Sequence, residues 1–278
     1  MINELKPEEF TRIMPLIHSL PTEQTVTIQS VVLRNTNGRI FVDNVEQPKT
    51  ALVWVLYCMF YFLGDPENPD FIDPLPMFFK TELIPMNEAC GCSCFITTLL
   101  EDHGWKMALD HLFQNSPVET GCRLAFSFDV KSFQAQNGQS GRLSNILPIN
   151  QMIADTYESA VLRDNIQEFW PDFQTFLKQG IGYFYLSETN QIVSACFSVA
   201  SAKGYQEIVI NTYDRSDRQK GYASMVAQAY IKKCLKRKEI PVWNTYETNW
   251  PSVRIAEKMG FKLQAKQPYY ELPFANFR

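Results

Sequence analysis

Arg218-Gln219-Lys220-Gly221-Tyr222-Ala223 is the stretch that decides the fold of this chain. It follows the apolar run Ile208-Val209-Ile210, and apolar residues then recur every three or four positions from Tyr222 to Leu235, as in an amphipathic helix. The first amides of a helix have no partner within the helix, and the helix dipole adds partial positive charge there. Glycine at position 221 lets a bulky anion approach the main chain. A strand, a turn and a helix start in this order therefore predict a pyrophosphate site.

A further strand and a further helix follow in the sequence. Pro241–Tyr246 is strand-like, Asn249–Met259 has helical spacing, and Gly260-Phe261 forms its exit. The pattern Arg/Gln-x-x-Gly-x-Gly/Ala after a strand resembles the acetyl-coenzyme A signature of the GNAT acyltransferases. With Pro-x-Trp, Asn-x-x-Ser and Gly-Phe, the chain is most similar to a branch that includes the zwittermicin A resistance acetyltransferases. The specific motifs span residues 192–270. Looser similarity extends towards the N-terminus, at Asp43, Ala51–Trp54 and Gly64-Asp65.

This resemblance implies both a fold and a reaction. The family fold is α/β, a twisted mixed sheet flanked by helices and split where two strands splay apart around the thioester. The implied co-substrate is acetyl-CoA, whose acetyl group passes directly to an amine of a small molecule, such as an aminopolyol antibiotic. The loop amides would bind the pyrophosphate, and the preceding strand would pair with the pantetheine amides. The residues expected to hold the coenzyme are Ile210, Asn211, Thr212, Tyr213, Arg218, Gln219, Lys220, Gly221, Tyr222, Ala223, Asn249 and Ser252.

Glu207 is the predicted general base. Acyl transfer to an amine requires that the amine lose a proton, and the three histidines, His18, His103 and His111, all lie in the first half. A histidine base within the second half is therefore excluded. Glu207 starts a strand eleven residues before Arg218, a spacing that resembles the histone acetyltransferase branch, where a strand carboxylate is the base. The alternative is a carboxylate exposed at the sheet edge.

The acid that protonates the leaving thiolate is harder to assign. Many GNAT members carry a tyrosine four residues before Gly-Phe, and Ala256 occupies that position here. Ser252 and Tyr246 are the candidate substitutes, and each also fits a packing or capping role. Asn249 has two interpretations as well: it can cap its helix, with Pro251 in the first turn, and it can reach the pantetheine arm.

A linker-like stretch, Ala135–Gly141, predicts two domains, 1–140 and 141–278. The second would be the GNAT acetyltransferase domain. We expect the first to be a smaller mixed α/β domain that covers the acceptor side and sets specificity. Its origin as a degenerate GNAT-like half is a hypothesis, because no repeat is visible in the residues.

Over the first 63 residues, the sequence predicts three strands. Thr25–Arg34 and Arg39–Asp43 are strand-like and flank Asn37-Gly38, which is a strong hairpin signal. The apolar run Ala51–Leu63 predicts one buried central strand, since a membrane helix needs about 17–25 residues.

Composition excludes several other classes of protein. The 278 residues carry a net charge of −4, which argues against nucleic-acid binding. The basic cluster Lys232–Lys238 suits the negative end of a helix dipole. Neither a signal peptide nor a membrane segment is recognised, so we expect a cytoplasmic protein with no membrane partner. A homodimer is left open.

The seven cysteines form an odd set and lie mostly in apolar runs, which favours reduced thiols. On a strand, Cys90, Cys92 and Cys94 would point the same way, with His103 nearby in sequence. Because Cys-x-Cys-x-Cys lacks the spacing common in zinc sites, we predict no metal site.

The rival interpretation is a non-catalytic protein that binds acyl-CoA for sensing or partner binding. Alanine at position 256 favours it, and Glu207 opposes it. The identity of the acceptor, the acyl chain length and the oligomeric state stay open.

Overall fold

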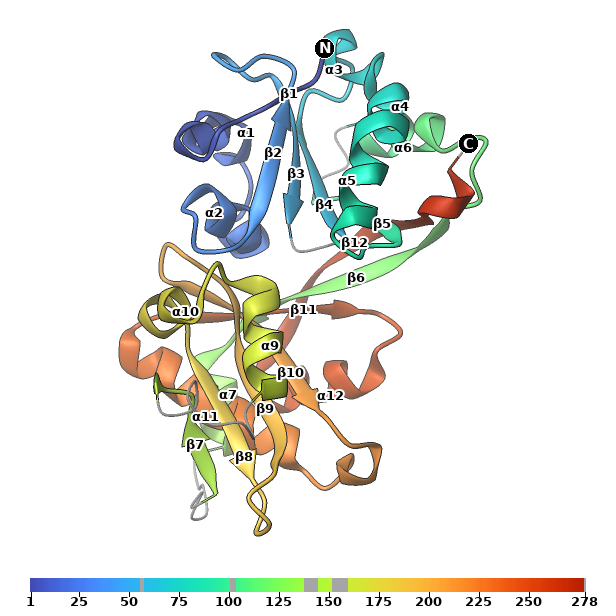
Figure 1. The fold of residues 1–278 in the computed structure, drawn as a ribbon. Helices are drawn as coiled ribbons and strands as arrows, with labels where there is room; N and C mark the ends of the chain where they lie inside the picture. Colours follow the sequence, from blue (N-terminus) through green and yellow to red (C-terminus); the bar gives the residue numbers. More distant parts are fainter. Residues whose placement is uncertain (56–57, 101–103, 138–144, 152–159, 278) are drawn as a thin grey trace. The chain divides into compact units, whose positions relative to one another are not determined.

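The chain forms two units with separate hydrophobic cores. The computed structural model describes residues 1–55, 58–100, 104–137, 145–151 and 160–277 (Figure 1). The N-terminal unit comprises Met1–Arg123 and Lys266–Arg278, and the C-terminal unit comprises Leu124–Ala265. This division differs from the predicted one at residue 140. The end of the chain joins the N-terminal unit because β12 (Phe261–Pro273) pairs antiparallel with β5 (Cys94–Thr98), from Tyr269 opposite Thr98 onward.

The C-terminal unit contains the strand–helix–strand–helix series that the sequence predicts over residues 208–259. Strand order is β12-β6-β11-β10-β9-β8-β7, with β6 and β12 also running into the N-terminal unit. Strands β8 and β9 form a hairpin, and the predicted strand–helix–strand–helix series is confirmed as β10, α11, β11 and α12. The sequence also has a helical pattern over residues 150–162, and of these, residues 152–159 lie outside the described part. The elements are β6 (Glu119–Phe128), α7 (Val130–Asn137), β7 (Ile146–Pro148), α9 (Ala160–Phe169), α10 (Phe173–Gln179), β8 (Gly182–Leu186), β9 (Ile192–Ala202), β10 (Tyr205–Thr212), α11 (Tyr222–Arg237), β11 (Ile240–Tyr246) and α12 (Trp250–Lys258).

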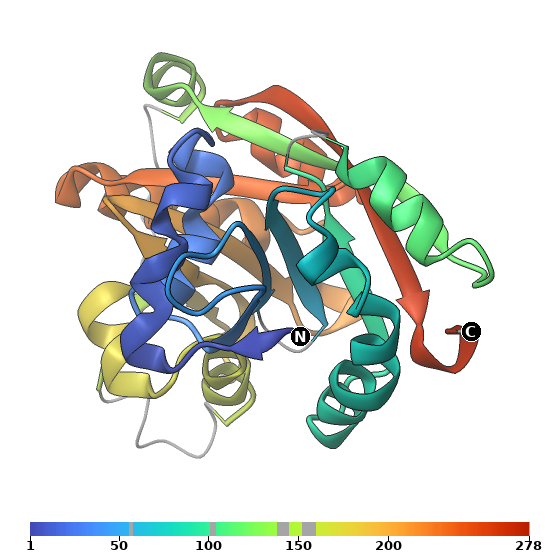
Figure 2. The same ribbon diagram turned by 90° about the horizontal axis from the view of Figure 1, so that it is seen from above.

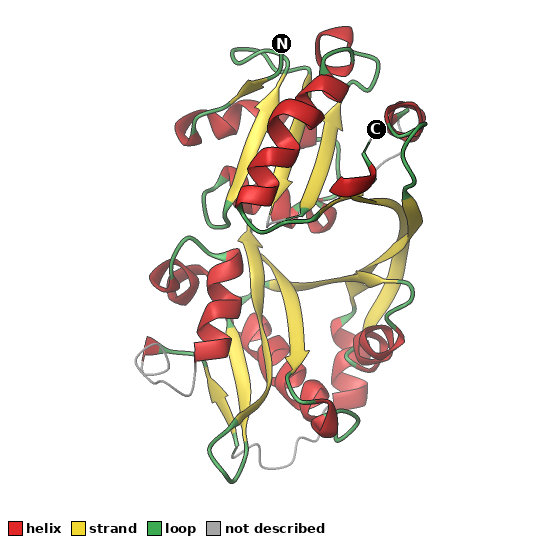
Figure 3. Cartoon of the chain, turned by 45° about the vertical axis from the view of Figure 1, so that its right-hand side comes forward, coloured by secondary structure: helices red, strands yellow, loops and turns green. Residues whose placement is uncertain are grey.

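Helices cover both faces of the sheet in this unit (Figure 3). Successive side chains of a strand point to opposite faces. On β10, Ile208 accordingly packs with the core beneath α11 and α12, while Val209 packs with the core beneath α9 and α10. We call these the α11/α12 face and the α9/α10 face. Trp170 is fully buried in the core beneath α9 and α10, where it donates its indole N–H to the carbonyl of Ser198 at 2.8 Å.

Strands β10 and β11 separate after a short parallel pairing. They pair from Tyr205 opposite Ile240 to Glu207 opposite Val242, and β10 then continues paired only with β9 as far as Thr212. Figure 1 shows the two strands running apart. From Ile208 onward, the edge of β10 that faces β11 is therefore open. This is the splayed sheet that the family resemblance implied.

The N-terminal unit is also a sheet between two layers of helices. Its strand order is β1-β2-β3-β4-β5-β12. One core lies beneath α1 and α2 and another beneath α4 and α5, on opposite sides of the strands (Figure 2). The elements are β1 (Asn3–Glu4), α1 (Met14–Ile17), α2 (Val26–Val32), β2 (Gly38–Val42), β3 (Thr50–Val55), β4 (Met59–Gly64), α3 (Pro69–Ile72), α4 (Leu75–Phe78), α5 (Ile84–Ala89), β5 and α6 (Trp105–Leu112). Short 3₁₀ turns of this unit span Pro7–Ile13, Thr22–Gln24 and Phe274–Asn276, and a π turn spans Phe79–Leu83. One further 3₁₀ turn, Arg215–Asp217, belongs to the C-terminal unit.

Two strand predictions in this unit are wrong. Thr25–Arg34 is not a strand, because Val26–Val32 forms α2, and no hairpin surrounds Gly38. All seven residues of α2 are buried, so tertiary packing overrides the strand preference of its β-branched residues. The apolar run Ala51–Leu63 is not one strand: β3 and β4 pair antiparallel, from Thr50 opposite Gly64 to Val55 opposite Met59. Both strands are buried, so no polar residue in this apolar run marks where β3 ends and β4 begins.

The three clustered cysteines do not share one strand. Cys90 directly follows α5, Cys94 begins β5, and the sulfur of Cys92 lies 2.9 Å from that of Cys58. Burial raises the pKa of the Cys94 thiol to about 12, with the nearby Cys58 adding to the shift. Within the described residues, no three His, Cys, Asp or Glu side chains are placed to hold a metal ion, and His103 lies outside them. In the same described part, no helix is both long and apolar enough to span a bilayer.

Candidate active site

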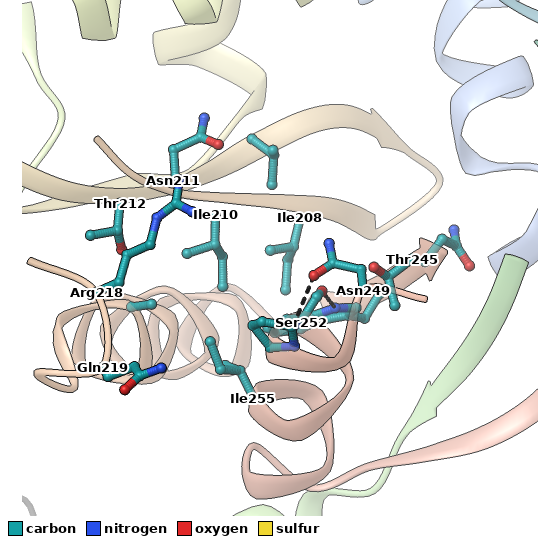
Figure 4. Close-up of a pocket in the computed structure, with 15 residues that line it drawn as sticks. Ile208, Ile210, Asn211, Thr212, Arg218, Gln219, Thr245, Asn249, Ser252 and Ile255 are labelled. Atoms are coloured by element: carbon teal, nitrogen blue, oxygen red, sulfur yellow. Dashed lines mark hydrogen bonds between the residues drawn. The ribbon is translucent and has the colours of Figure 1, made fainter. Parts of the chain in front are cut away.

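A cavity of about 660 Å³ lies at the splay of β10 and β11. It is bounded by the two strands and by the N-terminal parts of α11 and α12 (Figure 4). The strands contribute Ile208–Thr212 and Trp243–Thr245; the helices and the loop contribute Arg218, Gln219, Ala223, Asn249, Pro251, Ser252 and Ile255. Seven lining residues were not predicted from the sequence, which on the second strand pointed only to Tyr246: Ile208, Val209, Trp243, Asn244, Thr245, Pro251 and Ile255.

The lining comes from both faces of the sheet. In Figure 4, Ile208 and Ile210 point towards the helices, whereas Asn211 points away from them. Because strand residues alternate, Asn244 on β11 shares the α9/α10 face with Asn211, and Trp243 shares the α11/α12 face with Ile208. The gap between the strands thus joins the two faces.

The backbone of β10 presents alternate residues to the open edge. The N–H of Tyr213 donates to the carbonyl of Val193 on β9 at 3.1 Å. An antiparallel strand turns the main-chain groups of alternate residues towards the same neighbour. Asn211 therefore also faces β9, and the main-chain groups of Ile210 and Thr212 face the gap. Of the four strand residues expected to hold the coenzyme, 210–213, these two have main-chain groups in position to pair with the pantetheine amides.

The start of α11 has the backbone conformation of an anion-binding turn. Gln219 and Gly221 adopt positive φ angles of 65° and 89°. Gly221 precedes the first helical residue, and no side chain caps the helix there. Among the described residues, a Cβ atom at position 221 would approach only the Cε atom of Met225, at 4.0 Å, so space is open there beside the loop backbone. The first amides of α11 can thus meet an anion, as the helix dipole favours.

The charged and aromatic side chains of this loop have different surroundings. Arg218 lines the cavity and forms no ion pair with any residue that the structure describes. The ammonium group of Lys220 bonds to a carboxylate oxygen of Asp217 at 2.9 Å, and the Tyr222 ring lies 4.4 Å from that of Tyr185. Arg218 is accordingly the loop side chain best placed to neutralise a phosphate.

The Glu207 carboxylate lies beside the cavity rather than in its lining. Its side chain is buried, with 9 % exposed, where β10 and β11 last pair. The Oε1 atom accepts a hydrogen bond from Nδ2 of Asn244 at 2.9 Å. Asn244 itself lines the cavity. Glu207 therefore reaches the cavity by way of Asn244, on the α9/α10 face of the sheet.

Ser252 and Asn249 meet the cavity from the start of α12. The Oδ1 atom of Asn249 accepts from the Ser252 amide at 3.4 Å, which confirms the predicted cap, and Pro251 occupies the first turn. The Ser252 hydroxyl oxygen accepts from Nε1 of Trp243 at 3.0 Å (Figure 4).

The two other positions weighed for the acid do not line the cavity. Tyr246 ends β11, and its carbonyl accepts from the Asn249 amide at 2.9 Å. Ala256 is fully buried in the core beneath α12 and carries no hydroxyl group. Ser252 is thus the candidate acid that this geometry favours.

Comparison with known proteins agrees with this fold and site. The sequence profile of the family described as GNAT acetyltransferase matches residues 17–270, so the chain belongs to that family. It is an acetyltransferase, as the resemblance implied; the zwittermicin branch stays a prediction. A relative in Bacillus subtilis (strain 168), named Uncharacterized N-acetyltransferase YdfB, is 24% identical over 245 residues, covering 87% of this chain and 88% of the relative.

Two solved structures share the fold along nearly the whole chain. A GCN5-related N-acetyltransferase-like protein from Streptococcus suis 89/1591 is 22% identical, with a TM-score of 0.65 over 95% of this chain and 98% of that one. A tandem GNAT protein from the clavulanic acid biosynthesis pathway is 9% identical, with a TM-score of 0.63 over 99% of each chain. These likenesses show the fold.

Proposed function

We propose that this protein transfers the acetyl group of acetyl-CoA directly to the amine of a small molecule. The observation that carries the proposal is the cavity at the splay. It runs from the cationic start of α11 to Ser252 and to Asn244, which holds the Glu207 carboxylate. A long coenzyme with phosphates at one end and a thioester at the other fits such a site. The branch resemblance supports a small amine as the acceptor.

The coenzyme would lie along the α11/α12 face. The amides at the start of α11 and the Arg218 guanidinium would bind the pyrophosphate. The open main-chain groups of Ile210 and Thr212 would pair with the pantetheine amides, and Asn249 would border that arm. The thioester would then reach the gap beside Ser252.

The acceptor amine would approach from the α9/α10 face. Glu207 would remove its proton through a water molecule, because Asn244 stands between the carboxylate and the cavity. The amine nitrogen then attacks the thioester carbonyl carbon, a C–N bond forms, and the C–S bond breaks. Ser252 would donate a proton to the leaving sulfur.

Titration calorimetry with acetyl-CoA tests the coenzyme site. We expect the wild type to bind with a micromolar Kd, and Arg218→Met to bind at least about tenfold more weakly, because a charge-assisted hydrogen bond contributes roughly 1.5–3 kcal/mol. Arg215→Met is the matched control, since Arg215 is exposed and lies outside the cavity lining. Absence of binding by the wild type would make the loop a structural helix start and end the proposal.

Turnover distinguishes the enzyme from the rival acyl-CoA-binding protein. A panel of small amines would be incubated with acetyl-CoA, and release of the free coenzyme thiol would be followed. We expect amine-dependent release. Tight acetyl-CoA binding without release for any amine would favour the rival function, which the absence of a hydroxyl at Ala256 supports.

Asn244→Leu should lower kcat by about tenfold and leave the Kd for acetyl-CoA unchanged. Leucine keeps the shape of asparagine but loses the hydrogen bond that orients Glu207, and a bond to a charged group contributes roughly 1.5–3 kcal/mol. Steady-state kinetics with the best amine would measure the change. The same substitution in a Glu207→Gln background should have little further effect; independent losses would contradict the link between these two residues.

A further inference from the structure

Trp243 has the geometry of a donor aimed at one particular oxygen. It lies on β11, is 3 % exposed, and packs edge-on against Phe261 with ring centroids 5.2 Å apart. This packing fixes the indole ring. The Nε1 atom lies 3.0 Å from the Ser252 hydroxyl oxygen. An indole N–H can only donate, so the Ser252 oxygen must be the acceptor of this bond.

The proton of the Ser252 hydroxyl is consequently left for another partner. A serine hydroxyl has one proton to donate and two lone pairs with which to accept. Trp243 occupies one lone pair. Among the residues that the structure describes, none accepts a bond from this hydroxyl, not even the carbonyl of Thr248 four residues earlier, a common partner in helices. Ser252 lines the cavity, so its proton can be donated into the cavity.

We propose that Trp243 is a positioning residue that makes Ser252 the hydrogen donor to the leaving thiolate. The inference rests on the proposed function, in which Ser252 is the acid. When the C–S bond breaks, its electron pair stays on sulfur, and the Ser252 proton passes to it. The serine oxygen gains negative charge at that moment, and the indole N–H already pointing at it stabilises that charge. Solvent then returns a proton to the oxygen, and Glu207 releases the amine proton to solvent.

The arrangement also explains how the leaving thiolate would be protonated although position 256 is an alanine and not a tyrosine. A serine hydroxyl is a poor acid by itself, because its conjugate base is poorly stabilised. A fixed donor on the same oxygen supplies part of that stabilisation in a site bounded by apolar groups, such as Ile208 and Ile255. The competing interpretation is that the Trp243–Ser252 bond only ties α12 to β11.

A double-mutant cycle separates the two interpretations. Trp243→Phe keeps an aromatic ring against Phe261 and loses only the donor, and Ser252→Ala removes the hydroxyl. We expect kcat to fall about tenfold in the first variant and about a hundredfold in the second, with the Kd for acetyl-CoA unchanged in both. The double variant should be no slower than Ser252→Ala alone, because the indole acts only through the hydroxyl.

The controls keep each outcome interpretable. Trp250→Phe makes the same change at an exposed tryptophan of α12, outside the cavity lining, and should retain wild-type kinetics. Trp243→Met, which also lacks the donor, replaces the phenylalanine variant if that variant fails to bind acetyl-CoA. Wild-type kcat in Trp243→Phe, or losses that multiply in the double variant, would overturn the inference. If Ser252→Ala itself keeps wild-type kcat, the proposed role of Ser252 fails instead.

Discussion

Glu207→Gln is expected to lower kcat by about two to four orders of magnitude, the usual contribution of a positioned general base. Glutamine keeps the length of the side chain, and its amide oxygen can still accept the hydrogen bond from Asn244. The Kd for acetyl-CoA should therefore stay at the wild-type value, since the coenzyme would lie along the opposite face of the sheet. What is lost is the capacity to take a proton from the amine.

Steady-state kinetics and calorimetry on the same preparations would measure this separation of kcat from coenzyme binding. Glu257→Gln, at an exposed position of α12, is the control for loss of one carboxylate in this unit. Undiminished kcat in Glu207→Gln would remove Glu207 from the mechanism, while a large loss of acetyl-CoA binding would assign it to the coenzyme site.

Gly260→Ala should destabilise the C-terminal unit by about 3 kcal/mol or more. Gly260 has a φ angle of 83°, which costs a residue with a Cβ atom roughly 1–2 kcal/mol. The Cβ atom of an alanine at this position would also lie 2.5 Å from the backbone nitrogen of Phe133 and 3.0 Å from the carbonyl oxygen of Asp129. Asp129 directly precedes α7, and its amide donates to the Gly260 carbonyl at 3.0 Å. The backbone at the start of α7 therefore has little room to move away from an added Cβ atom.

Gly204→Ala is the matched control, because Gly204 has a φ angle of 81° and a Cβ atom added there would meet no atom of the other described residues within 4 Å. Urea denaturation followed by tryptophan fluorescence would compare both variants with the wild type. We expect the control to lose only the backbone cost of about 1–2 kcal/mol. Equal losses in the two variants would show that the contact with the start of α7 is relieved by movement.

Local signals in the sequence were sufficient for the elements that surround the cavity. The turn at Gly221, the helix that begins at Tyr222 and the cap at Asn249 depend on residues next to one another in the chain. Their backbone angles and caps follow from residue type, so a short motif determines them. The family match then confirmed the GNAT fold and the acetyltransferase class; the roles of the individual residues stay predictions.

Secondary-structure predictions failed for elements that are buried on both sides, because such elements lack the alternation of polar and apolar residues that marks a half-buried helix or strand. Val26–Val32 has the β-branched composition of a strand, and only its packing against the sheet of its unit makes it a helix. Similarly, no polar residue marks the break between β3 and β4, because both strands are buried and belong to one apolar run. The end of the chain joins the N-terminal unit through a pairing of β12 with β5 that residue type does not reveal.

By itself, the sequence determined the turn before α11, the cap of α12, the strand–helix–strand–helix series around the cavity and the family. Only the tertiary structure decided which partner each candidate catalytic side chain has. Glu207 meets Asn244 at the point where β10 and β11 stop pairing, and Trp243 meets Ser252 because α12 folds back over β11. Such contacts depend on where a strand stops pairing and on how a helix crosses it. These are properties of the packed sheet, which no local run of residues specifies.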